Sequence, residues 1–224
     1  SRVDCDLSLD LEARETMETH GVRYRDPIEA LVSGHVRAVT VHADGTSAAD
    51  EPVHGGLLSG SFNPLHEGHE RLAAVASEML NAPVTFELSV TNVDKPPLPE
   101  PETRERVAQF SGRHRVVVTR ALAFYQKANL FPGCTFVIGW DTAVRLVDPE
   151  YYGGNRSAMV AALVDLRRLG CDFLVAGRLE GGVFRTLGDV GVPAAFEGMF
   201  RPVPESVFRY DLSSTELRAA PRRG

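Results

Sequence analysis

The stretch Gly60-Ser61-Phe62-Asn63-Pro64-Leu65-His66-Glu67-Gly68-His69 decides how the fold of this chain is interpreted. It follows a short apolar run that begins at Gly56, and it leads into a helix-forming sequence that ends near Leu80. Backbone N–H groups at the start of a helix lack partners within the helix, and the helix dipole adds partial positive charge there. A small-residue turn between a strand and a helix therefore predicts a phosphate-binding site.

The two histidines of this stretch add chemistry to the turn. His66 and His69 are three residues apart, so their rings can lie on the same side of the helix start. Contact with phosphate is the interpretation that we favour. Two alternatives stay open: a structural role, or a shared metal ion with His54 as the other nearby ligand.

Composition excludes several classes of function. The chain has 224 residues, 43% of them hydrophobic, and a net charge of −6. This length fits one α/β domain with an extension. A negative surface does not attract nucleic acid or anionic membranes, so we expect small-molecule nucleotides as partners and an anionic ligand met by local groups. No apolar stretch approaches the length of a transmembrane helix, and no signal peptide is visible.

The cysteines indicate a compartment. Cys5, Cys134 and Cys171 are far apart and odd in number, and the last two begin apolar runs. Buried free thiols fit a reducing environment, so we expect a cytoplasmic protein. The chain begins at Ser1, which leaves open that it is part of a longer protein, and a homo-oligomer also stays open.

Apolar runs alternate with helical patterns from Gly55 onward. Short, continuously apolar strands between helices predict a parallel sheet covered on both faces, a Rossmann-like doubly wound α/β fold with ligands at the carboxyl ends of the strands. The expected strands are 56–60, 84–90, 116–119, 135–140 and 173–176, and the expected helices are 67–80, 102–110, 122–129, 142–147 and 156–169.

The first quarter of the chain differs from the rest. Residues 1–52 carry no chemical motif and are interpreted as a small N-terminal extension of unknown role, before a main domain over 53–224. Within the extension we expect a short helix at 27–33, a strand at 36–41 and a linker or hairpin arm at 47–52.

A second anion-binding signal lies near the end of the chain, in Asp211-Leu212-Ser213-Ser214-Thr215-Glu216-Leu217-Arg218. Ser213 or Ser214 is a suitable N-cap, which would hold with or without a ligand. The hydroxyl groups of Ser214 and Thr215, with the guanidinium of Arg218 one turn later, would form another anion cradle.

A third signal is the apolar strand that ends in Gly139-Trp140-Asp141-Thr142. In such folds an acidic residue just beyond a strand commonly binds ribose hydroxyls, and a glycine lets a ligand approach the backbone. Asp141 and Gly139 are therefore predicted to bind the nucleoside. The alternative is that Asp141 is an ordinary acidic residue at a helix start.

These three pieces, in this order, resemble the nucleotidylyltransferase superfamily over residues 55–220. The first fits the signature Gly-Ser/Thr-Phe-(Asn/Asp)-Pro-x-His-x-Gly-His at every position, and the last matches Ile-Ser-Ser-Thr-x-Ile-Arg with conservative changes. The Gly-x-Asp-Thr element makes the chain most similar to the nicotinamide or nicotinate mononucleotide adenylyltransferases.

The resemblance implies direct transfer of AMP from ATP to the phosphate of a mononucleotide, with release of pyrophosphate and with Mg²⁺ carried by the nucleotide phosphates. No protein nucleophile or general base is needed, because the acceptor phosphate is itself the nucleophile, and catalysis is positioning and charge neutralisation. The implied catalytic residues are His66, His69 and Arg218. Those implied to bind ATP are Gly60, Ser61, Phe62, Gly68, Gly139, Asp141, Ser213, Ser214 and Thr215.

For the acceptor the resemblance implies Lys95 in a loop, Arg106 in the following helix with Arg104 as its neighbour, and Arg178 after a later strand. Here the sequence departs from the family, which usually places an aromatic residue after Gly-x-Asp to stack on the pyridine ring. The sole tryptophan, Trp140, lies within the motif instead, and Tyr151 or Tyr152 is the substitute.

That departure leaves two alternatives. The first is a cytidylyl- or adenylyltransferase for another phosphorylated small molecule, such as a sugar phosphate or pantetheine phosphate. The second is a non-catalytic nucleotide-binding module, against which the presence of both histidines and Arg218 counts.

Overall fold

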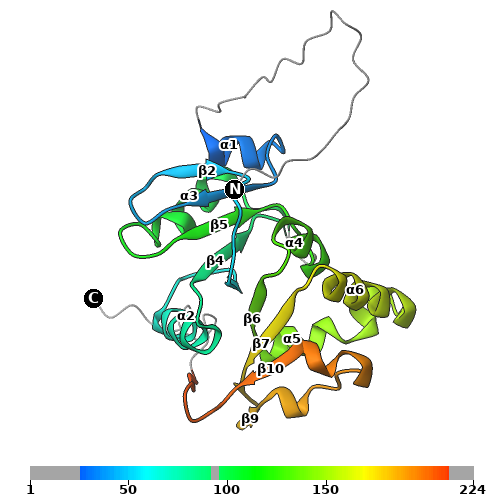
Figure 1. Ribbon diagram of the computed structural model, residues 1–224. Coiled ribbons are helices and arrows are strands. Elements are labelled where there is room, and N and C mark those ends of the chain that lie inside the picture. Colours follow the sequence, from blue (N-terminus) through cyan, green and yellow to red (C-terminus); the bar gives the residue numbers. More distant parts are fainter. Residues whose placement is uncertain (1–25, 92–95, 212–224) are drawn as a thin grey trace, which may run out of the picture.

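The computed structural model describes residues 26–91 and 96–211, which form one α/β fold around a central sheet (Figure 1). The sheet order is β10-β7-β6-β3-β4-β5-β1-β2. Its strands are β1 (Ala38–Val41), β2 (Ser47–Ala49), β3 (Gly56–Ser59), β4 (Val84–Ser89), β5 (Val116–Thr119), β6 (Thr135–Gly139), β7 (Asp172–Ala176) and β10 (Phe200–Val203).

The strands from β10 to β5 are parallel to their neighbours. Among these six parallel strands, the first three in the chain lie side by side in the order β3, β4, β5. The next three, β6, β7 and β10, follow one another on the other side of β3. This is the strand order of a Rossmann fold, in which the direction of winding reverses between the first and fourth strands. The predicted doubly wound fold is confirmed, and the reversal lies between β3 and β6.

Helices cover both faces of this sheet. In Figure 1, α2 lies on one side of the sheet and α5 and α6 lie on the other. Successive side chains along a strand therefore point to opposite faces of the sheet. Leu58 faces the core under α2 and α3, whereas Leu57 faces the core under α4, α5 and α6. The helices are α1 (Pro27–Val32), α2 (Glu67–Leu80), α3 (Glu100–Ala108), α4 (Phe124–Leu130), α5 (Trp140–Leu146) and α6 (Arg156–Arg168).

Helix α2 begins at the predicted residue and buries one stripe. Leu72, Ala73 and Ala76 are buried, at the spacing of one helix face. The helix ends at Asn81, whose left-handed backbone (φ +48°) closes the last turn, as a short polar residue can do. None of the described helices is long and apolar enough to cross a membrane.

The elements before residue 53 continue the same sheet. Strand β1 pairs antiparallel with β5, and β2 pairs antiparallel with β1. The side chain of Asp50 fastens the hairpin by accepting hydrogen bonds from the backbone N–H groups of Arg37 and Ala38. Residues 27–49, which the sequence assigns to an N-terminal extension, thus lie at one end of the sheet of the main domain (Figure 1).

Several short elements of the structure were not predicted from the sequence. They are β10, the two-stranded sheet β8 (Arg178–Glu180) and β9 (Val183–Arg185), and the 3₁₀ helices Pro149–Tyr152, Leu187–Asp189 and Ala194–Met199. Trp140, expected at the end of a strand, is instead the first residue of α5. These pieces are too short to show a helix or strand period in the sequence.

Candidate active site at the sheet switch point

A cavity of about 400 Å³ lies at the carboxyl ends of β3, β6 and β7. This is the place where open α/β sheets bind ligands, because the chain leaves β3 and β6 in opposite directions there. Residues from four separate segments of the chain form its walls: His66, Gly68, His69, Leu72, Gly139, Asp141, Ala176, Gly177, Arg178, Leu179, Glu180, Gly181, Phe208, Tyr210 and Asp211.

The two motif histidines stack on one another at the start of α2. Their ring centroids are 3.7 Å apart, and the planes are inclined by 28°. His66 is the N-cap residue, with an extended backbone. Its backbone N–H donates to Nδ1 of His69 (3.3 Å), so the proton of a neutral His69 ring is on Nε2.

Burial keeps these rings uncharged. Burial, and to a smaller extent the charge of a nearby protonated His66, lower the pKa of His69 to about 3. Burial also lowers the pKa of His66, an effect that Glu70 partly opposes. Both rings therefore act as neutral hydrogen-bonding groups near pH 7. An arriving polyphosphate would favour their protonated forms.

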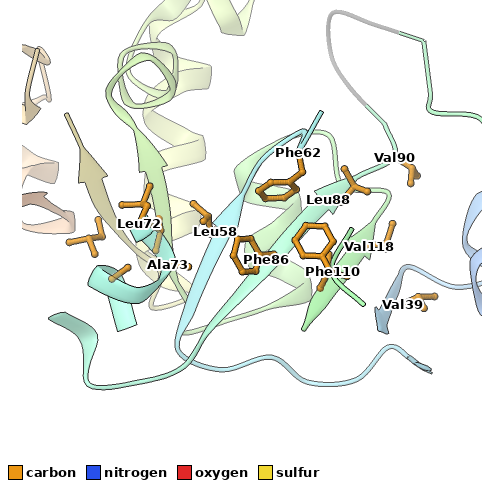
Figure 2. Packing of buried hydrophobic residues seen from close by; sticks show 14 of the residues in the cluster. Val39, Leu58, Phe62, Leu72, Ala73, Phe86, Leu88, Val90, Phe110 and Val118 are labelled. Carbon is orange, nitrogen blue, oxygen red and sulfur yellow. The ribbon is translucent and has the colours of Figure 1, made fainter. Parts of the chain in front are cut away.

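The motif loop is anchored to the core by Phe62. Its side chain is fully buried and meets Phe86 and Phe110 edge to face, with centroids 5.5 and 5.3 Å away (Figure 2). It also meets the edge of His69 at 5.1 Å. Phe62 has a backbone φ of +43°, which residues other than glycine seldom adopt, and the packing of its ring offsets the strain. Gly60 is required beside it, because a Cβ there would lie 2.8 Å from the Phe62 ring.

Helix α3 holds the other side of the loop. Nη1 of Arg106 donates to the carbonyl oxygen of Ser61 (2.9 Å). The side chain of Gln109 donates to the carbonyl oxygen of Phe62 (2.9 Å) and accepts from the N–H of Leu65 (2.7 Å). No sequence pattern indicates Gln109, because it lies 44 positions beyond Leu65 and belongs to no motif.

Asp141 and Arg178, which both line the cavity, form an ion pair with one another. Nη1 of Arg178, at the start of β8, lies 3.2 Å from Oδ1 of Asp141, in the first turn of α5. Gly139 leaves room for this carboxylate, since a Cβ on Gly139 would lie 2.9 Å from the same oxygen. The structure thus brings together Gly139, Asp141 and Arg178, which the sequence selected separately.

Residues 179–181, in β8 and the turn after it, and the segment 208–211 were missed as walls of the cavity. The hairpin β8–β9 packs on Gly177, where a Cβ would lie 2.6 Å from the Phe184 ring. Tyr210 stacks on His66 with centroids 5.4 Å apart and planes inclined by 11°. The sequence signal that could have identified Tyr210 and Asp211 as site residues is their position immediately before the C-terminal motif.

Several other predicted site residues either do not line the cavity or lie outside the part of the chain that the structure describes. Arg106 binds the motif loop and Glu102. Trp140 packs against the core under α5, and its buried indole N–H has no hydrogen-bond partner among the described residues. Tyr151 is 51% exposed and lies beside Arg145, while Tyr152 donates to the carbonyl oxygen of Leu146 (3.0 Å). Lys95, Ser213, Ser214, Thr215 and Arg218 lie outside the described residues.

The charges of the cavity are unusual for an anion site. Among the described residues that line it are one arginine, Arg178, and three acidic residues: Asp141, Glu180 and Asp211. Arg178 is itself paired with Asp141. A polyphosphate in this cavity would need additional positive charge, from a cation or from residues outside the described part.

Comparison with known proteins identifies the family. A search of curated proteins finds no match for this chain. A family model described as cytidylyltransferase-like matches residues 57–220, which include the motif loop, Gly139–Asp141 and the C-terminal Ser-Ser-Thr motif. The match covers well over half of the chain, supports a nucleotidyltransferase activity, and agrees with the Rossmann-like sheet. The chain belongs to the cytidylyltransferase-like family.

Proposed function

We propose that this nucleotidyltransferase transfers AMP from ATP to the phosphate of nicotinamide or nicotinate mononucleotide. One observation carries the proposal: residues of the His-x-Gly-His and Gly-x-Asp motifs line a single cavity at the switch point of the sheet. The C-terminal motif continues directly from Asp211, which also lines that cavity.

The reaction makes one bond and breaks one bond. An oxygen of the acceptor phosphate attacks the α-phosphorus of ATP, and the bond from that phosphorus to the bridging oxygen of pyrophosphate breaks. The leaving pyrophosphate keeps the electron pair, so no proton needs to reach the protein. The protein aligns the two phosphates and stabilises the charge that moves toward the leaving group.

The roles that we assign follow the cavity walls. His66 and His69 donate hydrogen bonds to the phosphates, and the N–H groups at the start of α2 point to the same place. Asp141 accepts from ribose hydroxyls after releasing Arg178, which then meets a phosphate. Ser214, Thr215 and Arg218 bind the distal phosphates.

Mg²⁺ fits this arrangement as an ion carried by the nucleotide. The described walls hold three carboxylates and one arginine, so they do not neutralise a triphosphate by themselves. Bound to phosphate oxygens, Mg²⁺ neutralises part of their charge, and it needs few direct protein ligands. The described carboxylates can receive its bound waters by hydrogen bonds.

Activity with defined substrates tests the proposal. Pure protein is incubated with ATP, Mg²⁺ and each mononucleotide, and pyrophosphate and dinucleotide are measured. We expect both products in equal amounts, and their loss in a His69→Ala variant. A wild-type rate no higher than that of the variant contradicts the proposal.

A second candidate keeps the chemistry and changes the substrates. It is cytidylyl or adenylyl transfer to another phosphorylated small molecule. The observation that favours it is the position of Tyr151 and Tyr152, neither of which lines the cavity. A panel of ATP and CTP against sugar phosphates and pantetheine phosphate separates the two candidates, since a strict preference for ATP with a pyridine nucleotide excludes the second.

A further inference from the structure

Tyr210 occupies a position that the motif residues do not explain. Its ring lies nearly parallel to that of His66, at 5.4 Å and 11°, and His66 in turn stacks on His69 at 3.7 Å. Tyr210 also packs against the apolar core under α2, near the buried Phe208. A row of three rings therefore leads from the core cluster along one wall of the cavity.

The glycine of the His-x-Gly-His motif fits this row. A Cβ built on Gly68 would lie 2.4 Å from Cδ1 and 2.6 Å from Cε1 of Tyr210. Real Cβ atoms do not approach other atoms so closely, so a side chain at position 68 would displace the tyrosine ring. In this chain, therefore, the absence of a side chain at Gly68 makes room for Tyr210.

Tyr210 also joins two parts of the site that are far apart in sequence. It contacts the start of α2, more than 140 positions earlier, and it lies three positions before Ser213. At the other end of the row of rings, His69 is held by its contact with the Phe62 ring and by a hydrogen bond from the backbone N–H of His66. The ring of His66 thus stacks with both His69 and Tyr210.

We propose that Tyr210 is a positioning residue, which fixes the ring of His66 by stacking and holds the chain that leads into the C-terminal motif against the start of α2. This inference rests on the proposed role of both motifs in binding one triphosphate. Tyr210 acts through His66 and through the backbone, and its hydroxyl group is not required. A flat ring at position 210 is sufficient.

A double-mutant cycle tests this contact. The variants are Tyr210→Ala, Gly68→Ala, the double variant and Tyr210→Phe, with Tyr125→Ala as the control for loss of a half-exposed tyrosine elsewhere (39% exposed). We measure the dissociation constant of Mg-ATP by titration calorimetry, the kcat, and the ring signals of His66 by NMR in the absence of substrates.

We expect Tyr210→Phe and Tyr125→Ala to stay within about twofold of wild type in affinity and kcat. Tyr210→Ala and Gly68→Ala should each weaken Mg-ATP binding and lower kcat by about tenfold or more, and should shift the His66 signals. The double variant should be no worse than Tyr210→Ala alone, because the added methyl group then meets no ring.

Additive losses in the double variant would overturn the proposal. So would a Tyr210→Ala protein with a lower melting temperature but unaltered Mg-ATP affinity and His66 signals, since that pattern describes packing only. If wild type turns over no acceptor, the proposed function fails, and the ring signals and Mg-ATP affinities still decide the role of Tyr210.

Discussion

The two sides of the predicted site differ in how the protein holds them. On the nucleotide side, the motif loop is fixed by the ring of Phe62, by Gln109 and by Arg106, and the histidines stack in a defined row. On the side assigned to the acceptor, Arg178 lines the cavity, but Trp140 and Tyr151 have other neighbours and do not line it. A motif that specifies backbone shape therefore predicts position more securely than the chemical type of a single residue does.

The largest effect should come from the nucleotide side. His69→Ala removes a buried hydrogen-bond donor at the transferring phosphate, and we expect kcat to fall by about 10²–10³-fold. Steady-state kinetics with ATP and a mononucleotide measures this loss, with His54→Ala as the control. If both variants lost activity equally, His69 would have no special part in the reaction.

The next effect concerns the ribose. Asp141→Ala removes the proposed acceptor for ribose hydroxyls and leaves Arg178 with its longer contact to Glu180 (4.0 Å). We expect the KM for ATP to rise about tenfold, which corresponds to roughly 1.4 kcal/mol. Asp165→Ala, which removes an exposed carboxylate on α6, is the matched control. An unaltered KM for ATP in Asp141→Ala would mean that Asp141 does not bind the ribose.

A pH titration of stability examines the histidine row without substrates. Below the ordinary pKa of 6.5, His69 gains a proton in the unfolded chain but stays neutral in the fold until about pH 3. The unfolded state then binds more protons, so His69 lowers the free energy of unfolding as pH falls through this window, by up to about 1.4 kcal/mol per pH unit.

Chemical denaturation of wild type and His69→Gln over that window measures the contribution. The wild-type protein should lose stability more steeply than the variant as the pH is lowered from 6.5. Parallel curves for the two proteins would mean that the His69 ring is not shielded from protons in the fold.

The smallest effect should come from the acceptor side. Tyr151 is half exposed and lies beside Arg145, away from the cavity walls. We expect Tyr151→Ala to alter the acceptor KM by less than about threefold and the free energy of unfolding by less than about 0.5 kcal/mol. A tenfold rise in the acceptor KM would show that Tyr151 turns to the acceptor when substrates bind.

The sequence predicted the alternating strands and helices, because short apolar runs such as 135–139 are typical of buried parallel strands and the stripe of α2 has the period of a helix. It also predicted the loops at the switch point, since glycines and caps specify local backbone shape. It could not predict residues 179–181 as part of a wall, or Gln109 and Tyr210 as partners of the motif. Those contacts depend on tertiary packing between distant segments, which leaves no local pattern.

The most direct test is a structure with Mg²⁺ and a non-hydrolysable ATP analogue. We predict that the adenosine ribose lies at Asp141 and that the phosphates lie between His66, His69 and the segment 213–218. An analogue bound outside the cavity at the ends of β3 and β6, with the histidine rings free of phosphate, would contradict it.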